Sequence, residues 1–178
     1  MDIMLLRLYQ QQVLLQCEFV LAATKEIDAG LAQAGSNSNS QVFYGIQNLL
    51  NAAANICKAL WGAKGKRSVE REALRASIGV TDASPLREVG MRNSFEHFDE
   101  RLDRWWQDSP RHNHVDFSIG PRSAIQGFDD NDVFRMFDTG TTEVIFWSER
   151  FSIQAIVDEI QRILPKLSIE ATKPHWEE

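Results

Sequence analysis

The sequence predicts a single, mainly α domain with a small β element inserted before its last helix. Two observations predict this class. Apolar residues recur at helical spacing over most of the chain, whereas between about 113 and 149 they alternate with polar residues. The chain has 178 residues, 43% hydrophobic and 25% charged, which is enough for one domain, 1–178, with its own core.

Three helices are expected in the first half. The first runs from Asp2 to about Ala32, and the cluster GSNSNS that begins at Gly35 ends it. The second spans Gln41 to Leu60, and a shorter third helix follows from Ser68, as its N-cap, to about Ser77. The first two are expected to bury one stripe each: Leu5, Leu8, Val13, Phe19, Val20, Ala23 and Ile27 in the first, and Val42, Ile46, Leu49, Leu50, Ala53, Ile56 and Leu60 in the second.

A fourth helix is expected from about Leu86 to Gln107, after the turn that ends in Pro85. At about 100° per residue, two stripes lie on roughly opposite sides of it. The core-facing stripe consists of Phe95, Phe98, Leu102 and Trp105 or Trp106. The polar stripe, which fits a solvated face as well as a functional one, consists of Asn93, His97, Glu100 and Arg104.

The β element and a closing helix complete the prediction. Val115, Phe117 and Ile119 alternate with polar residues. Two further apolar runs, 133–137 and 143–147, flank DTGTT, which predicts an antiparallel hairpin around Gly140. The last helix begins after Ser152 and ends at about Leu167, so about five helices are expected in all, over 2–107 and 152–167.

Composition narrows the function classes. The net charge is −6, so any nucleic-acid binding would rest on a local basic patch. No signal peptide or membrane span is expected, and the cytoplasm is the default location. Cys17 and Cys57 both fall within helices, where buried free thiols are expected.

The stretch Arg-Asn-Ser-Phe-Glu-His, from Arg92 to His97, resembles the R-x4-H motif of HEPN-domain proteins. The order of helices around it is also similar to that family. The resemblance covers the helical part of the chain and implies a HEPN-like bundle with the β element as an insertion. It also resembles a group of uncharacterised bacterial HEPN-like proteins through KALW, GKR, ALR and SPLREVG.

This resemblance implies a metal-independent endoribonuclease of the toxin or defence type, with no cofactor and an active site shared across a homodimer. His97 would act as general acid or base on the RNA, Arg92 would stabilise charge on the phosphorus, and Asn93 would hold the phosphate or orient His97. Arg92 lies about 140° from His97 around a straight helix, which also favours a site completed by a second copy. The resemblance further implies an antitoxin or other protein partner, although some HEPN proteins are non-catalytic dimerisation or binding modules for nucleotides, RNA or proteins.

Two carboxylates, Glu96 and Asp99, are candidates for tuning His97. Asp99 stands where the toxin branch of the family has a tyrosine, so control through that tyrosine is not carried over. Glu96 directly precedes the histidine.

Other polar clusters give weaker signals. The segment 58–75 contains six basic and two acidic residues. It either guides RNA or is a solvated loop. Its candidate RNA-binding residues are Lys64, Lys66, Arg67 and Arg71. The alternating His112, His114 and Asp116 could present metal ligands on one side of a strand, but no cysteine is nearby and no metal site is expected. DDND at 129–132 is better explained as a turn than as a calcium loop.

Overall fold

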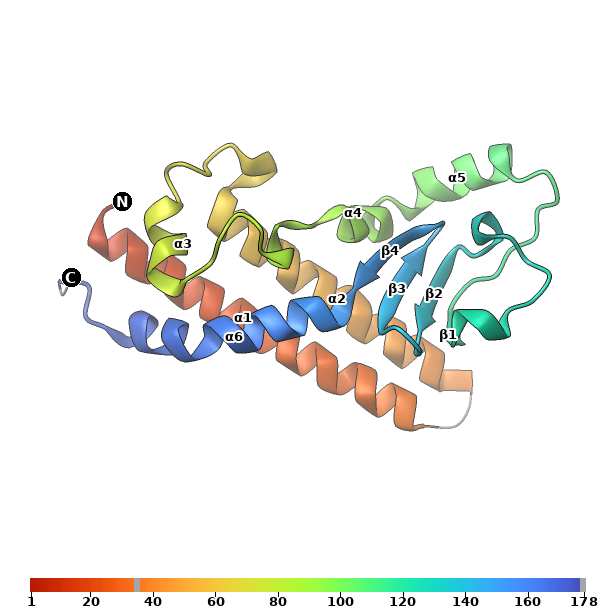
Figure 1. The fold of residues 1–178 in the computed structure, drawn as a ribbon, viewed down its shortest axis with the longest axis horizontal. Coiled ribbons are helices and arrows are strands. Elements are labelled where there is room, and N and C mark those ends of the chain that lie inside the picture. Colours follow the sequence, from red (N-terminus) through yellow and green to blue (C-terminus); the bar gives the residue numbers. More distant parts are fainter. Residues whose placement is uncertain (34–35, 177–178) are drawn as a thin grey trace. The chain divides into compact units, whose positions relative to one another are not determined.

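The computed structural model describes residues 1–33 and 36–176; within these, the side chains of Ser36, Asn37 and Lys64 are not described. The described chain is mainly helical with one small sheet, as predicted (Figure 1). Its contacts divide into two compact units. The first unit comprises Met1–Ala23, Asn48–Val89 and the described part of Ala155–Glu178, and the second comprises Thr24–Gln47 and Gly90–Gln154. None of the described helices combines the length and apolarity that a membrane span requires.

Four helices build the first unit: α1 (Ile3–Ala32) and α2 (Ser36–Trp61), each of which also extends into the second unit, α3 (Glu72–Ile78) and α6 (Ile153–Thr172). In this unit α6 runs alongside α1 (Figure 1). The predicted α2 stripe is confirmed, because all seven of its residues are buried. Burial of such side chains contributes about 1.5–3 kcal/mol each. The two cysteines are buried and free, also as predicted.

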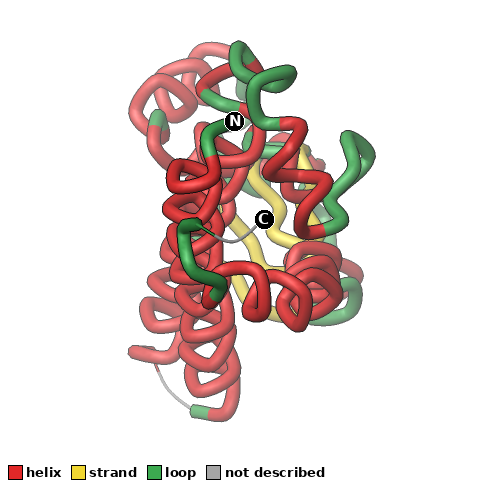
Figure 2. Tube along the Cα trace, turned by 90° about the vertical axis from the view of Figure 1, so that its left-hand side faces the viewer, coloured by secondary structure: helices red, strands yellow, loops and turns green. Residues whose placement is uncertain are grey.

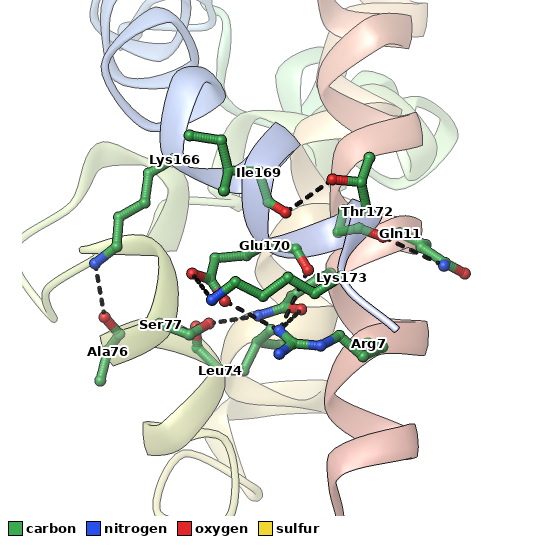
Figure 3. Close-up of polar contacts among 12 residues, drawn as sticks. Arg7, Gln11, Leu74, Ala76, Ser77, Lys166, Ile169, Glu170, Thr172 and Lys173 are labelled. Atoms are coloured by element: carbon green, nitrogen blue, oxygen red, sulfur yellow. Dashed lines mark hydrogen bonds and ion pairs between the residues drawn. The ribbon is translucent and has the colours of Figure 1, made fainter. Parts of the chain in front are cut away.

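A polar network joins α1 to the end of α6 (Figure 3). The buried guanidinium of Arg7 donates to the Glu170 carboxylate at 3.0 Å and to Gln10 at 2.9 Å. Lys173 also pairs with Glu170 at 2.8 Å, and Gln10 donates to Ser77 at 2.9 Å. Because Arg7 is charged and buried, these partners offset the cost of removing it from water.

A second network fixes the segment between α2 and α6. The buried Arg75 of α3 donates to the carbonyls of Leu60 at 2.8 Å and Ser68 at 2.7 Å. Its Nε lies 3.5 Å from Asp82, which accepts from the Trp61 indole at 2.7 Å. That indole hydrogen bond, together with nearby arginines, holds the pKa of Asp82 below its usual range. Arg75 is therefore a structural residue.

Glu159 of α6 has two hydrogen-bond donors. Arg162 donates to it at 2.6 Å, and the Ser84 hydroxyl donates at 2.6 Å. These hydrogen bonds, chiefly that from Arg162, outweigh partial burial and hold the pKa of Glu159 below its usual range.

The second unit contains the sheet, whose strands are drawn in yellow in Figure 2. Its strands are β1 (Ser118–Gly120), β2 (Arg135–Asp138), β3 (Glu143–Phe146) and β4 (Glu149–Ser152), in that order across the sheet. β2 and β3 form the predicted hairpin, in which Phe137 pairs with Val144. β1 pairs with β2 in parallel, so the sheet is not wholly antiparallel as predicted. The sheet buries Val133, Met136 and Ile145 against the half-buried Val115 and Ile125.

Several predicted boundaries were wrong. β4 stands where the sequence indicated only the cap of the last helix, and that helix continues beyond Leu167 to Thr172. The third helix begins at Glu72 instead of Ser68, after a series of turns from Lys66 to Arg71. The described chain has six α-helices instead of about five, because the predicted fourth helix is replaced by a 3-10 turn over Pro85–Arg87 and two α-helices.

The predicted α1 stripe was only half right. Of its members Val13, Val20, Ala23 and Ile27 are buried, but Leu5 and Leu8 are exposed. Leu8 and Cys17 are nine positions apart, about 180° around a helix, so one flat core cannot cover both. Phe19 is exposed on the same side as Leu8.

Candidate functional site

The residues of the R-x4-H motif lie where the chain breaks from one helix into another within the second unit. α4 (Gly90–Glu96) ends just before His97, and α5 (Phe98–Asp108) begins just after it. His97 has φ −103° and ψ 41°, outside the helical range. Its amide nevertheless donates to the Asn93 carbonyl at 2.9 Å, and its carbonyl accepts from Arg101 at 3.2 Å. The break is therefore a kink between two hydrogen-bonded turns.

The break has a packing reason. Phe95 and Trp105 are both buried, whereas Phe98 and Leu102, which would lie between them around a straight helix, are exposed. A change of direction at His97 allows each ring to be buried. The predicted core stripe is corrected accordingly: Phe98, Leu102 and Trp106 are 47%, 37% and 61% exposed.

Contacts with the sheet hold α4 in place. The Phe95 ring lies 5.3 Å from the Phe146 ring of β3 in an edge-on arrangement. Ser94, which is fully buried, donates to the Glu149 carboxylate of β4 at 2.9 Å. With this side of α4 buried, Asn93, Glu96 and His97 are left exposed, and Arg92 is partly exposed.

The carboxylate of Glu96 lies between the arginine and the histidine. Arg92 Nη2 donates to Glu96 Oε1 at 2.8 Å, and Arg92 Nη1 also ion-pairs with Glu96. The oxygen that pairs with Nη1, Glu96 Oε2, also lies 4.0 Å from His97 Nε2. Arg92 Nη1 further donates to Asn93 Oδ1 at 3.4 Å. The structure thus gathers Arg92, Asn93, Glu96 and His97, with Glu96 as the link.

A second acidic group, Glu100, approaches the histidine from α5. His97 Nδ1 lies 3.6 Å from Glu100 Oε1. Glu100 was not predicted as a tuning residue, although it shares the predicted polar stripe with His97. Asp99, which was predicted, is exposed in the first turn of α5, where its charge favours the helix N-terminus.

The positions of Arg92, Glu96 and His97 define the chemistry that these residues can perform. An imidazole that is 54% exposed can exchange protons with a substrate, and a guanidinium can hold a phosphate through two parallel hydrogen bonds. Glu96 already occupies that guanidinium, so a phosphate has to displace it. The pair is partly exposed and spaced i,i+4, for which about 0.3–0.5 kcal/mol is typical. Displacement is therefore energetically cheap.

The predicted RNA-binding residues lie in the first unit, in the turns before α3. Lys66 is exposed, whereas Arg67 pairs with Glu70 at 2.6 Å. The Arg71 guanidinium stacks 3.6 Å from the centre of the Tyr9 ring and also donates to its hydroxyl. The side chain of Lys64 lies outside the described residues. Arg67, Arg71 and Tyr9 line a hollow of about 610 Å³ with Met1, Leu5 and Glu70.

The histidines of the 111–116 segment have partners other than a metal. The His112 ring stacks on Trp106 with centroids 3.9 Å apart, and the His114 ring lies 4.7 Å from Trp105. Asp116 pairs with Arg135 at 2.5 Å. No group of three or more potential metal ligands occurs among the described residues. The acidic segment 129–132 forms the predicted turn, a 3-10 helix with a capping box between Asp129 and Asp132.

The chain was also compared with known proteins. No family model matches it, and neither the curated proteins nor the solved structures gave a significant match.

Proposed function

We propose that this chain is a metal-independent endoribonuclease of the HEPN type, acting through Arg92, Asn93 and His97. One observation carries the proposal: Arg92 is paired with Glu96, and His97 lies 4.0 Å from the same carboxylate, at an accessible kink between two helices. A homodimer that brings two such kinks together would supply the arginine of one copy to the histidine of the other.

The reaction needs only these side chains. His97 would take the proton from a ribose 2′-hydroxyl, and the 2′-oxygen would attack the adjacent phosphorus. The bond from phosphorus to the 5′-oxygen would then break, and a protonated imidazole would supply a proton to that leaving oxygen. The products are a 2′,3′-cyclic phosphate and a free 5′-hydroxyl. Arg92 would stabilise the charge that develops on the phosphate oxygens, and Asn93 would donate a further hydrogen bond.

Glu96 would act as an internal substitute for the phosphate. In the absence of RNA it neutralises Arg92 and keeps the guanidinium oriented. A phosphate that binds Arg92 would displace Glu96 from the guanidinium.

The test is cleavage of mixed RNA in EDTA by the wild type and by His97→Ala, with end-group analysis of the products. We expect cyclic phosphate ends from the wild type and none from His97→Ala. His175→Ala, which removes an exposed histidine from the C-terminal segment, is the matched control and should cleave normally. Equal cleavage by wild type and His97→Ala would refute the proposal.

A second candidate function is a non-catalytic binding module. The observation that favours it is the apolar stripe Phe98, Leu102 and Trp106, which is exposed on α5 directly after His97. Such a stripe next to a charged pair fits a protein partner better than RNA. If intact RNA is recovered at every condition, while Trp106→Ala abolishes binding of a co-purifying protein, this second function is the correct one.

A further inference from the structure

The turns before α3, in the first unit, hold an arginine that forms no ion pair. Within the described part of the chain every arginine pairs with a carboxylate except Arg71 and Arg104. Arg104 is exposed on α5, whereas Arg71 is only partly exposed. The Arg71 guanidinium stacks 3.6 Å from the centre of the Tyr9 ring and donates to the Tyr9 hydroxyl. Its charge is therefore held in one orientation without an acidic partner among the described side chains.

A second arginine lies one helical turn before Arg71. The Arg71 amide donates to the Arg67 carbonyl at 3.0 Å, so the two side chains leave the backbone on the same side. Arg67 pairs with Glu70 at 2.6 Å, and the two side chains are 59% and 62% exposed. An ion pair with this exposure is weak, because water screens it. A ligand of higher negative charge can therefore displace Glu70 from Arg67.

Both arginines line one hollow, which has a volume of about 610 Å³. This volume is within the range of about 300–1,000 Å³ that is usual for small-molecule sites. The N-terminal part of the chain supplies another part of its wall, through Tyr9 and through Met1 and Leu5, which are 42% and 43% exposed. The hollow thus has a cationic wall and an apolar wall, which fits a ligand with an anionic group and an apolar group.

Charge decides which anion fits the hollow. The segment 58–75 has six basic and two acidic residues, a net of +4 in a chain of −6, so it attracts anions although the chain as a whole does not. At pH 7 a phosphate monoester carries a charge of about −1.5 to −2, whereas a carboxylate or a phosphodiester carries about −1. A monoester that displaces Glu70 brings additional negative charge to two guanidiniums. A carboxylate or a diester only replaces one negative charge by another.

We propose that this hollow binds a small organic phosphate monoester. Arg71 and Arg67 hold the phosphate, since their paired N–H donors match its oxygens, and Glu70 is displaced from Arg67. The organic group lies against Leu5 and Met1. The hollow shares no residue with the Arg92 to His97 site, so the proposal goes beyond the proposed ribonuclease and does not depend on it.

The test is isothermal titration calorimetry of the full chain with phenyl phosphate, a simple aromatic monoester. Three compounds each change one property of this probe: methyl phenyl phosphate is a diester, benzoate is a carboxylate, and inorganic phosphate has no organic group. Phenyl phosphate should bind about tenfold more tightly than each of them. Absence of phenyl phosphate binding, or equal binding of the diester or of benzoate, would overturn the proposal.

Variants place the binding in the hollow. Arg71→Gln should weaken phenyl phosphate binding about tenfold or more, whereas Arg104→Gln, which removes the other arginine without an ion pair, should not change it. Glu70→Gln should tighten binding about fivefold, because it removes the competing negative charge, and a gain of affinity does not arise from misfolding. Leu5→Ser should weaken binding of phenyl phosphate but not of inorganic phosphate. Circular dichroism checks that each variant is folded.

Two results with the variants would contradict the proposal. If phenyl phosphate binding survives Arg71→Gln but is lost in Arg92→Gln, the monoester binds at the proposed active site and not in the hollow. If an RNA oligonucleotide binds through Arg71 equally well with and without a 5′-phosphate, the hollow recognises phosphodiesters instead of a monoester.

Discussion

Replacing Glu96 by glutamine should strengthen RNA binding, because it removes the negative charge that competes with phosphate for Arg92. Glutamine keeps the length of the side chain and an oxygen that can still accept from Arg92 at the position of Glu96 Oε1. Glu96→Gln therefore tests the effect of the negative charge of Glu96 alone. It also leaves the buried side of α4 unaltered, since Glu96 is exposed.

The size of the effect is estimated from Coulomb's law for a phosphate that takes the place of Glu96 on the guanidinium. A phosphate on Arg92 would lie about 4 Å from the Glu96 carboxylate, and two like charges at that distance repel by about 1 kcal/mol in water. Glu96 is 46% exposed, so the value for water is the appropriate one. About 1 kcal/mol corresponds to about a fivefold lower Kd. In about 1 M salt, where the screening length falls to about 3 Å, the gain should disappear.

The assay is fluorescence polarisation of a labelled single-stranded RNA, with His97→Ala in the background of every variant so that no cleavage occurs. Asp28→Asn is the control, because it removes one exposed negative charge from α1 without touching the site. Tighter binding by Glu96→Gln alone supports phosphate binding at Arg92. If Glu96→Gln binds no more tightly than Asp28→Asn, the assignment of Arg92 as the phosphate ligand is refuted.

The remaining predictions concern the first unit. Arg75→Met should lower the free energy of unfolding by about 2–4 kcal/mol, because the carbonyls of Leu60 and Ser68 lose their hydrogen-bond donor. Urea unfolding measures this change. A loss below about 0.5 kcal/mol would contradict the prediction. Glu159 has a depressed pKa, so its contribution to stability is present above the unfolded pKa of about 4.3 and is lost as pH falls through the lower folded pKa. The stability difference between wild type and Glu159→Gln should therefore shrink below about pH 4, and a constant difference down to pH 2 in thermal unfolding would count against it. Burial, and to a lesser extent the charge of Glu18, raises the pKa of Cys17 to about 12. A thiol reagent at neutral pH should therefore modify Cys17 only after denaturation. Rapid labelling of Cys17 in the folded chain, detected by mass spectrometry of its peptides, would contradict this prediction.

The fourth predicted helix shows why part of the candidate site could not be read from the sequence. Periodicity identified 86–107 as helical, and it placed Asn93, His97 and Glu100 on one side. It did not reveal the kink at His97, because no proline or glycine marks it. The kink arises where Phe95 packs against Phe146 of β3 and Trp105 is buried beside His114, and both neighbours lie outside the predicted helix.

The predicted apolar stripe of α1 also shows what helical spacing cannot specify. Apolar residues on both sides of the helix follow helical spacing equally well, so the pattern predicted the helix correctly but merged two faces into one. Only burial separates Cys17, in the core, from Leu8, which is exposed.

By itself the sequence determined which segments are helical and where the hairpin lies, because local periodicity and turn residues act over a few positions and need no knowledge of the rest of the chain. It also determined that Cys17 and Cys57 are buried thiols. The tertiary structure decided which apolar face of α1 is covered, where the motif helix bends, and that Glu96 lies between Arg92 and His97. Those features depend on residues far apart in the sequence that compete for the same core, and sequence spacing alone does not specify the outcome of that competition.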